Sequence, residues 1–131
     1  EGNIIDSIIY YLSLPLAKLP TWIGAEALMV VQQLINFLIP SGSGQASTTM
    51  PIMAPLADII GITRQTGVLC FQFGDGWSNL LWPTCSVIAF CGIAHIPYGR
   101  WLKFWWKLGV ITFILCAVFI FIANAMRYGP F

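Results

Sequence analysis

The sequence has 131 residues, of which 58% are hydrophobic and 8% are charged. A soluble globular domain carries about 25% charged residues, so this composition excludes an ordinary soluble protein and predicts an integral membrane protein. The formal net charge of +1 provides no basic surface, which excludes nucleic acid as an expected partner.

Three long stretches of the chain carry no charged residue, namely 27–57, 76–99 and 108–126. A membrane-spanning helix needs roughly 20 mainly apolar residues, so each stretch is long enough to enter or cross a bilayer. The cysteines lie in apolar segments without the close spacing of a metal site, and we interpret them as packing residues. No resident metal is therefore expected.

The first expected element is an interfacial helix at residues 3–18. Apolar and polar residues alternate along it, and Pro15 and Pro20 interrupt it before it is long enough to span a bilayer. We therefore expect this helix to lie along the membrane surface, with its polar side toward water.

Residues 22–60 consist of two apolar arms around a polar, glycine-rich tip at residues 40–48. At a rise of 1.5 Å per residue, the arms reach only about 27 Å and 21 Å. Two arrangements fit: two crossings joined by an external loop, or a re-entrant hairpin whose tip ends at membrane depth. We favour the re-entrant hairpin, because the tip carries no charge and because Pro51 and Pro55 shorten and kink the second arm.

Residues 63–96 are apolar except for a polar break at residues 74–83. Neither half reaches across a bilayer alone, whereas both together do, which is typical of a discontinuous transmembrane helix. Residues 100–107 combine cations with tryptophans, as at a membrane interface, and the cations favour the cytoplasmic side. Residues 108–126 are predicted to form an uninterrupted transmembrane helix.

The two polar breaks are the main functional signal. A break frees backbone N–H and C=O groups for a ligand; helix N-termini favour carboxylates, and freed carbonyls favour cations. Glycine leaves this backbone uncovered, while serine, glutamine and asparagine add neutral hydrogen-bonding groups. The structural alternative is that small residues serve close packing between membrane helices. Two breaks with several polar groups each favour the binding interpretation.

Asp75 is the most informative single residue of the breaks. An ionisable group at membrane depth is costly and indicates an ion, proton or substrate site, unless the break lies near the surface and water solvates the carboxylate. For Glu26 and Asp58 we favour a structural role near the headgroup boundary. His95, close to the end of its apolar segment, fits an interfacial histidine better than a proton relay.

An enzyme is not expected. The serine-containing loop at residues 40–45 would have to supply a nucleophile for an intramembrane hydrolase, with His95 as its base. The Gly-x-Ser-Gly pattern of such a loop is missing, because Ser41 stands two residues before Ser43 and Ile39 stands two residues before Ser41.

The chain contains the motifs NFLIPSGSGQA at residues 36–46, MPIMAPLAD at 50–58, TRQT at 63–66, FQFGDG at 71–76 and IPYGRWLKF at 96–104. Ser78-Asn79 and Pro83-Thr84 continue the series. In combination these motifs, which extend from about residue 20 to residue 107, resemble the DcuC/YfcC-type family of C4-dicarboxylate anaerobic carriers. Some members of that family are labelled basic amino-acid antiporters.

The resemblance implies a carrier with two inverted repeats, each holding a re-entrant hairpin and a broken helix, and it places this chain in the second repeat. It also implies that substrate and a coupling Na⁺ or H⁺ bind between these elements, with Na⁺ near Asp75 and Asn79. The implied site residues are Ser41, Gly42, Ser43, Gly44, Gln45, Asp75, Ser78, Asn79 and Thr84. Trp82 and Cys85 depart from the family pattern, which has a smaller residue and a serine there, so both bear on substrate selection.

We therefore expect the C-terminal part of an ion-coupled secondary transporter in the bacterial cytoplasmic (inner) membrane, with several crossings. Its solutes would be small and charged, amino acids or C4-dicarboxylates, and amino acids are slightly favoured because Asp75 suits a cationic group. Expected partners are the lipid bilayer, the small-molecule substrate, the remainder of the carrier and a second copy in a homodimer. No cofactor is expected.

Residues 1–131 are expected to be one membrane segment of a larger carrier, which does not transport by itself. The alternative function, from a different class, is a non-transporting membrane subunit or interaction fragment.

Overall fold

The computed structural model describes Tyr11, Pro15 and residues 18–129. These residues form the helices α2 (Thr21–Leu38), α3 (Gly42–Ile60), α4 (Arg64–Ser78), α5 (Cys85–Ile93) and α6 (Tyr98–Ala125), and no strand occurs among them. The prediction of an all-α protein is confirmed. The interfacial helix expected at residues 3–18 lies almost entirely outside the described residues.

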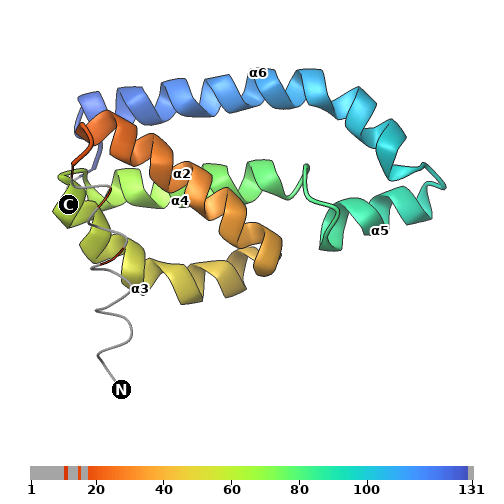
Figure 1. Ribbon diagram of the computed structural model, residues 1–131, viewed down its shortest axis with the longest axis horizontal. Coiled ribbons are helices and arrows are strands. Elements are labelled where there is room, and N and C mark those ends of the chain that lie inside the picture. The colour runs from red at the N-terminus through yellow and green to blue at the C-terminus, as the bar shows by residue number, and fades with distance from the viewer. Residues whose placement is uncertain (1–10, 12–14, 16–17, 130–131) are drawn as a thin grey trace.

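Helices α2 and α3 form a hairpin with a very short connection at residues 39–41 (Figure 1). The sequence predicts a long tip at residues 40–48, whereas α3 already begins at Gly42. Ser41 makes this early start possible, because its Oγ accepts a hydrogen bond from the Gly44 backbone N–H at 3.3 Å and so caps the helix. Pro51 and Pro55 both lie within the helix, which continues past them to Ile60.

The interruption between α4 and α5 is shorter than the sequence predicts and begins later. Residues 74–78, expected to open the break, continue α4, and the interruption covers residues 79–84. Ser78 is compatible with the helix, because its Oγ donates to the Gly74 carbonyl oxygen at 2.6 Å. The connecting residues are held by backbone bonds such as that from the Trp82 N–H to the Ser78 carbonyl at 2.9 Å.

Helix α6 is one continuous helix of 28 residues. The basic, tryptophan-rich segment at residues 100–107 and the apolar segment after it therefore belong to the same element. Among the described residues, α6 is the helix that is long and apolar enough to cross a membrane: its most apolar 18-residue stretch has a mean hydropathy of 2.5, and 17% of that stretch is buried.

The helices pack around α2 and α4, which lie against each other and share the most extensive contact of the fold. In Figure 1, α6 runs along one side of this pair, α3 lies on the opposite side, and α5 stands apart beside the first turns of α6. The core between α2, α3, α4 and α6 consists of Ala25, Leu28, Met29, Met53, Leu56, Ala57, Ile60, Ile62, Cys70 and Ile120.

Gly74 explains how closely α2 and α4 approach. A Cβ atom added at Gly74 would lie 2.7 Å from the Gln32 Cβ and 2.8 Å from the Met29 carbonyl oxygen. Real side chains do not tolerate such distances, so only glycine permits this contact. The close approach brings the polar residues of α2 next to those at the end of α4.

Candidate functional site

A group of polar side chains is buried where α2, the start of α3 and the end of α4 meet. We call Gln32, Asn36, Gln45, Asp75 and Asn79 the polar cluster; the first three are fully buried, Asp75 is 8% exposed and Asn79 is half-buried. Its members follow helical spacing, since Gln32 and Asn36 are four residues apart, as are Asp75 and Asn79. Each helix therefore turns one polar face toward the same place.

Asp75 is the only acidic member of the polar cluster, and amide groups hold its carboxylate. The Asn36 Nδ2 donates to Asp75 Oδ1 at 2.6 Å, and the Asn79 Nδ2 donates to the same oxygen at 3.2 Å. The ion pair found among the described residues joins Asp58 to Arg64, so no described cation neutralises Asp75. A buried carboxylate held only by neutral donors retains the capacity to bind a cationic group.

The second oxygen of Asp75 faces the start of α3. A Cβ atom added at Gly42 would lie 3.1 Å from Asp75 Oδ2, so the absence of a side chain at Gly42 leaves room for this oxygen. Gly42 is the first residue of α3, where the helix dipole places partial positive charge near a carboxylate. The carboxylate therefore lies between the amides of α2 and α4 on one side and a helix N-terminus on the other.

Gln45 links the cluster from α3 to α2. Its Oε1 accepts from the Asn36 Nδ2 at 3.1 Å, and its Nε2 donates to the Gln32 Oε1 at 2.8 Å and to the Gln32 carbonyl oxygen at 2.9 Å. Asn36 thus shares one amide nitrogen between Gln45 and Asp75. This network fixes the position of the hairpin tip against α4.

Some buried polar atoms of this region have no hydrogen-bond partner among the described residues. They are Gln32 Nε2, Gln33 Nε2, Asn36 Oδ1 and Thr49 Oγ1. Leaving a buried polar atom unpaired costs about 1–3 kcal/mol, so such atoms are uncommon without a reason. The Asn36 Oδ1 is the most suggestive of them, because its own amide nitrogen bonds to Asp75, and amide and carboxylate oxygens are ligands for hard cations.

The structure brings only part of the predicted set of site residues together. Gly42, Gln45, Asp75 and Asn79 meet in or beside the polar cluster. Ser78 is buried next to them, but its hydroxyl bonds to the carbonyls of Gly74 and Asp75 in its own helix.

The other predicted residues lie at the edges of this region. Ser41 caps α3 and Ser43 is exposed, while the Gly44 carbonyl oxygen accepts from the hydroxyls of Ser47 and Thr48. Thr84 precedes α5 and is half-buried; within the described part of the chain, no hydrogen bond joins its side chain to the polar cluster.

Gln32, Gln33 and Asn36 are not among the predicted site residues, because all three lie in α2 and not in a break. A signal for them exists in the sequence. They are neutral polar residues in the uncharged, apolar part of α2 that follows Glu26, and Gln32 and Asn36 share one face. Polar residues within a membrane helix usually face other helices and not lipid.

Trp82 closes one side of this region. Its Nε1 donates to the Gln33 carbonyl oxygen at 2.8 Å, and its ring packs edge-on against Phe37 with the ring centroids 5.3 Å apart. Trp82, which departs from the expected family pattern, therefore contacts α2 directly. Both residues that it contacts lie within one helical turn of Asn36.

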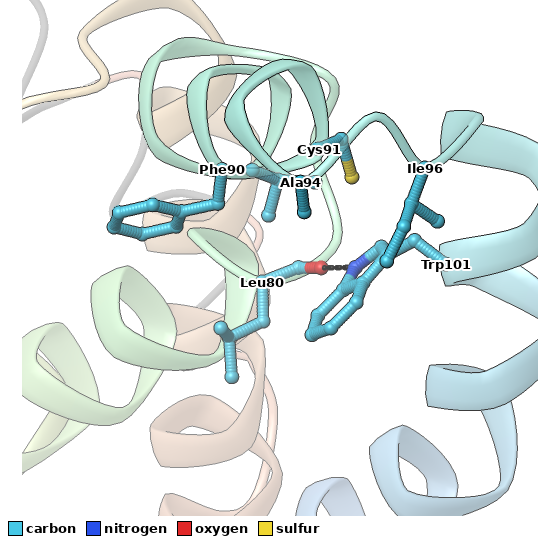
Figure 2. A pocket seen from close by; sticks show the side chains of 7 residues that line it. Leu80, Phe90, Cys91, Ala94, Ile96 and Trp101 are labelled. Carbon is cyan, nitrogen blue, oxygen red and sulfur yellow. Dashed lines mark hydrogen bonds between the residues drawn. The ribbon is translucent and has the colours of Figure 1, made fainter.

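The α4–α5 interruption is bound by α6. The Trp101 Nε1 donates to the Leu80 carbonyl oxygen at 3.0 Å, as Figure 2 shows, and the Tyr98 hydroxyl donates to the Leu81 carbonyl oxygen. An apolar cavity of about 180 Å³ lies beside this contact, lined by Leu80, Val87, Phe90, Cys91, Ala94, Ile96 and Trp101. The sequence predicts that carbonyl groups in this break are free for a ligand. The Leu80 and Leu81 carbonyls instead accept hydrogen bonds from α6 and hold the interruption against that helix.

Comparisons with known proteins match almost the whole chain. A sequence model of the DcuC family, described as C4-dicarboxylate anaerobic carrier, matches residues 1–125. An Escherichia coli (strain K12) protein named "Putative basic amino acid antiporter YfcC" is 36% identical over 129 residues, which are 98% of this chain and 26% of that protein.

A Haemophilus influenzae protein that carries no functional name is also 36% identical, over 104 residues, which are 79% of this chain and 20% of that protein. The chain thus spans about a quarter of the length of these curated relatives, or less. No solved structure matches it.

Proposed function

The chain belongs to the C4-dicarboxylate anaerobic carrier family, and we propose that it supplies the solute-binding part of an ion-coupled secondary transporter. The family is one of carriers, which argues for transport and not for catalysis. In this proposal the protein is a multi-pass component of the bacterial cytoplasmic membrane. The hairpin of α2 and α3 enters the bilayer from one side, and α4 and α5 act as one discontinuous helix.

The single observation that carries the proposal is the environment of Asp75. Its Oδ1 is held by Asn36 and Asn79, its Oδ2 faces Gly42 at the start of α3, and no described cation pairs with it. In an apolar chain, a buried acidic residue among amides is expensive unless it serves an ion or solute. Helix ends and short connections like those around Asp75 are the elements with which transporters hold solutes near the middle of the bilayer.

The proposed solutes are small charged organic molecules, amino acids or C4-dicarboxylates. We favour amino acids, because an ammonium group would pair with Asp75 while a carboxylate would meet the N-terminal end of α3. A coupling Na⁺ would find oxygen ligands at Asp75, Asn36 and Asn79. The remainder of the carrier and a second copy of it are the proposed protein partners.

The experiment is equilibrium binding and uptake with the complete carrier, purified and reconstituted in proteoliposomes. Asp75→Asn removes the charge and keeps the shape, so solute or cation affinity is expected to fall at least tenfold and uptake with it. Asp58→Asn is the matched control, because Asp58 is an exposed carboxylate that pairs with Arg64 at 2.7 Å, away from the cluster. Unchanged binding by Asp75→Asn would refute the proposed site.

A further inference from the structure

A second acidic residue, Glu26, lies in a groove between α2 and α6 that the proposed solute site does not use. The groove has a volume of about 570 Å³ and opens to the outside of the described structure. Its lining is apolar apart from Glu26 and includes Trp22, Val30, Phe113, Val118 and Phe121. Glu26 is half-buried within it.

Glu26 has no hydrogen bond or ion pair within the described part of the chain. The titratable groups that face it are thiols, Cys70 on α4 and Cys116 on α6, and neither can neutralise a carboxylate. On α3, the carboxylate of Asp58 is turned to Arg64. No described lysine, arginine or histidine therefore balances the charge of Glu26.

An ionised carboxylate in this position is costly, because no described residue supplies a counter-charge or donates a hydrogen bond to it. Taking up a proton removes that cost at once. Glu26 also follows the exposed Trp22 by four residues, or about 6 Å along the helix, and tryptophan favours the membrane interface, where lipid meets water. A proton can therefore reach Glu26 from that side of the membrane.

We propose that Glu26 is a proton-binding site of the carrier, distinct from the polar cluster. Ten residues of α2 separate Glu26 from Asn36, which places the two sites about 15 Å apart along one helix. The inference rests on the proposed transport function and deepens it by naming the proton as a coupling ion. The proton passes from water to a carboxylate oxygen of Glu26 and returns to water when the groove faces the opposite compartment.

The first test is chemical labelling of the complete carrier in membranes. Dicyclohexylcarbodiimide is apolar and reacts with carboxyl groups that are protonated in apolar surroundings, so Glu26 is expected to be modified, and less so as the pH rises. Peptide mass spectrometry locates the label, and exposed Asp58 is the internal control that stays unmodified. An unmodified Glu26 at low pH overturns the proposal and indicates instead that a cation from the remainder of the carrier pairs with it.

The second test separates coupling from solute binding. Glu26→Gln resembles the protonated form of the residue. In proteoliposomes this variant is expected to keep the solute affinity of the wild type within about twofold. Its uptake driven by a pH gradient is expected to fall at least tenfold. Glu26→Asp is expected to restore part of that uptake. Undiminished pH-driven uptake by Glu26→Gln overturns the proton site.

The two proposals fail in different ways. Asp75→Asn is expected to lose solute binding itself, at every pH and without any gradient. If Asp75→Asn binds solute normally while Glu26→Gln is uncoupled, the solute site is wrong and the proton site stands. If Asp75→Asn fails to bind solute and Glu26→Gln stays coupled, the solute site stands and the proton site is wrong.

Discussion

Asn36 Nδ2 lies 2.6 Å from Asp75 Oδ1, and this hydrogen bond joins α2 to α4 across 39 residues of sequence. The same nitrogen lies 3.1 Å from Gln45 Oε1 on α3. One amide group therefore holds together three helices at the place where the only acidic side chain of the polar cluster is buried. Its substitution tests both the packing of these helices and the proposed solute site.

Asn36→Ala is expected to weaken solute binding about tenfold and to destabilise the protein. The substitution leaves Gln45 Oε1 without its donor and Asp75 Oδ1 with Asn79 alone, and a buried unpaired group costs about 1–3 kcal/mol. Affinity is measured by isothermal titration of the complete carrier, and stability by thermal unfolding in detergent. Asn124→Ala is the control, because among the described residues the Asn124 side chain makes a single long hydrogen bond, of 3.5 Å, to Thr21. Equal effects of both substitutions would contradict a special role of Asn36.

Gly74→Ala is expected to destabilise the protein by about 1–3 kcal/mol, since its methyl group would overlap Gln32 and the Met29 carbonyl and force α2 away from α4. Gly76→Ala is a close control: it lies in the same helix, and a Cβ atom there would meet nothing within 4 Å. Alanine favours helix over glycine, so Gly76→Ala should raise stability by about 0.5–1 kcal/mol. Thermal unfolding of both variants measures the difference, and opposite signs are expected.

Gly42→Ala is expected to reduce solute affinity more than stability. Its methyl group would lie 3.1 Å from Asp75 Oδ2 and displace the carboxylate from the start of α3. Gly92→Ala, at a helical glycine with open space around it, serves as the control. Binding and unfolding are compared for both variants, and a Gly42→Ala protein that binds like wild type would place the solute elsewhere.

Trp101→Phe is expected to loosen the α4–α5 interruption. It removes the N–H that bonds to the Leu80 carbonyl but keeps an aromatic ring, so the loss in stability should be about 0.5–1.5 kcal/mol. Amide hydrogen exchange should rise in residues 79–93. Trp106→Phe is the matched control in the same helix, because Trp106 is exposed. Unchanged exchange in Trp101→Phe would show that α6 does not restrain the interruption.

The sequence predicts which segments contain Gln45, Asp75 and Asn79, but not the contacts that these residues make. The composition predicted a helical membrane protein, and the polar stretches indicated Gln45, Asp75 and Asn79. The boundaries of the breaks differ from the prediction, because serine side chains support the helices there: Ser41 caps α3, and the hydroxyl of Ser78 bonds to the turn before it. Glycine and serine frequencies alone cannot distinguish these local roles.

The contacts of Asn36 could not be predicted from local patterns. Asn36 meets Asp75 only because α2 and α4 approach at Gly74, and that approach depends on the packing of the whole hairpin. The same holds for Trp101 and Leu80, which are 21 residues apart. Helical spacing identifies a polar face, as at Gln32 and Asn36. Which residues contact that face depends on the tertiary structure.

In the proposed carrier α6 crosses the bilayer as one unbroken helix, which predicts that the lipids around it affect the protein. A helix of 28 residues is about 42 Å long, whereas the hydrocarbon layer is about 30 Å thick, so α6 must tilt or extend into the headgroups. Its first turn holds the Leu80 and Leu81 carbonyls through Trp101 and Tyr98. In the proposed carrier, acyl-chain length is therefore expected to set the tilt of α6 and, through these hydrogen bonds, the strain on the connection between α4 and α5.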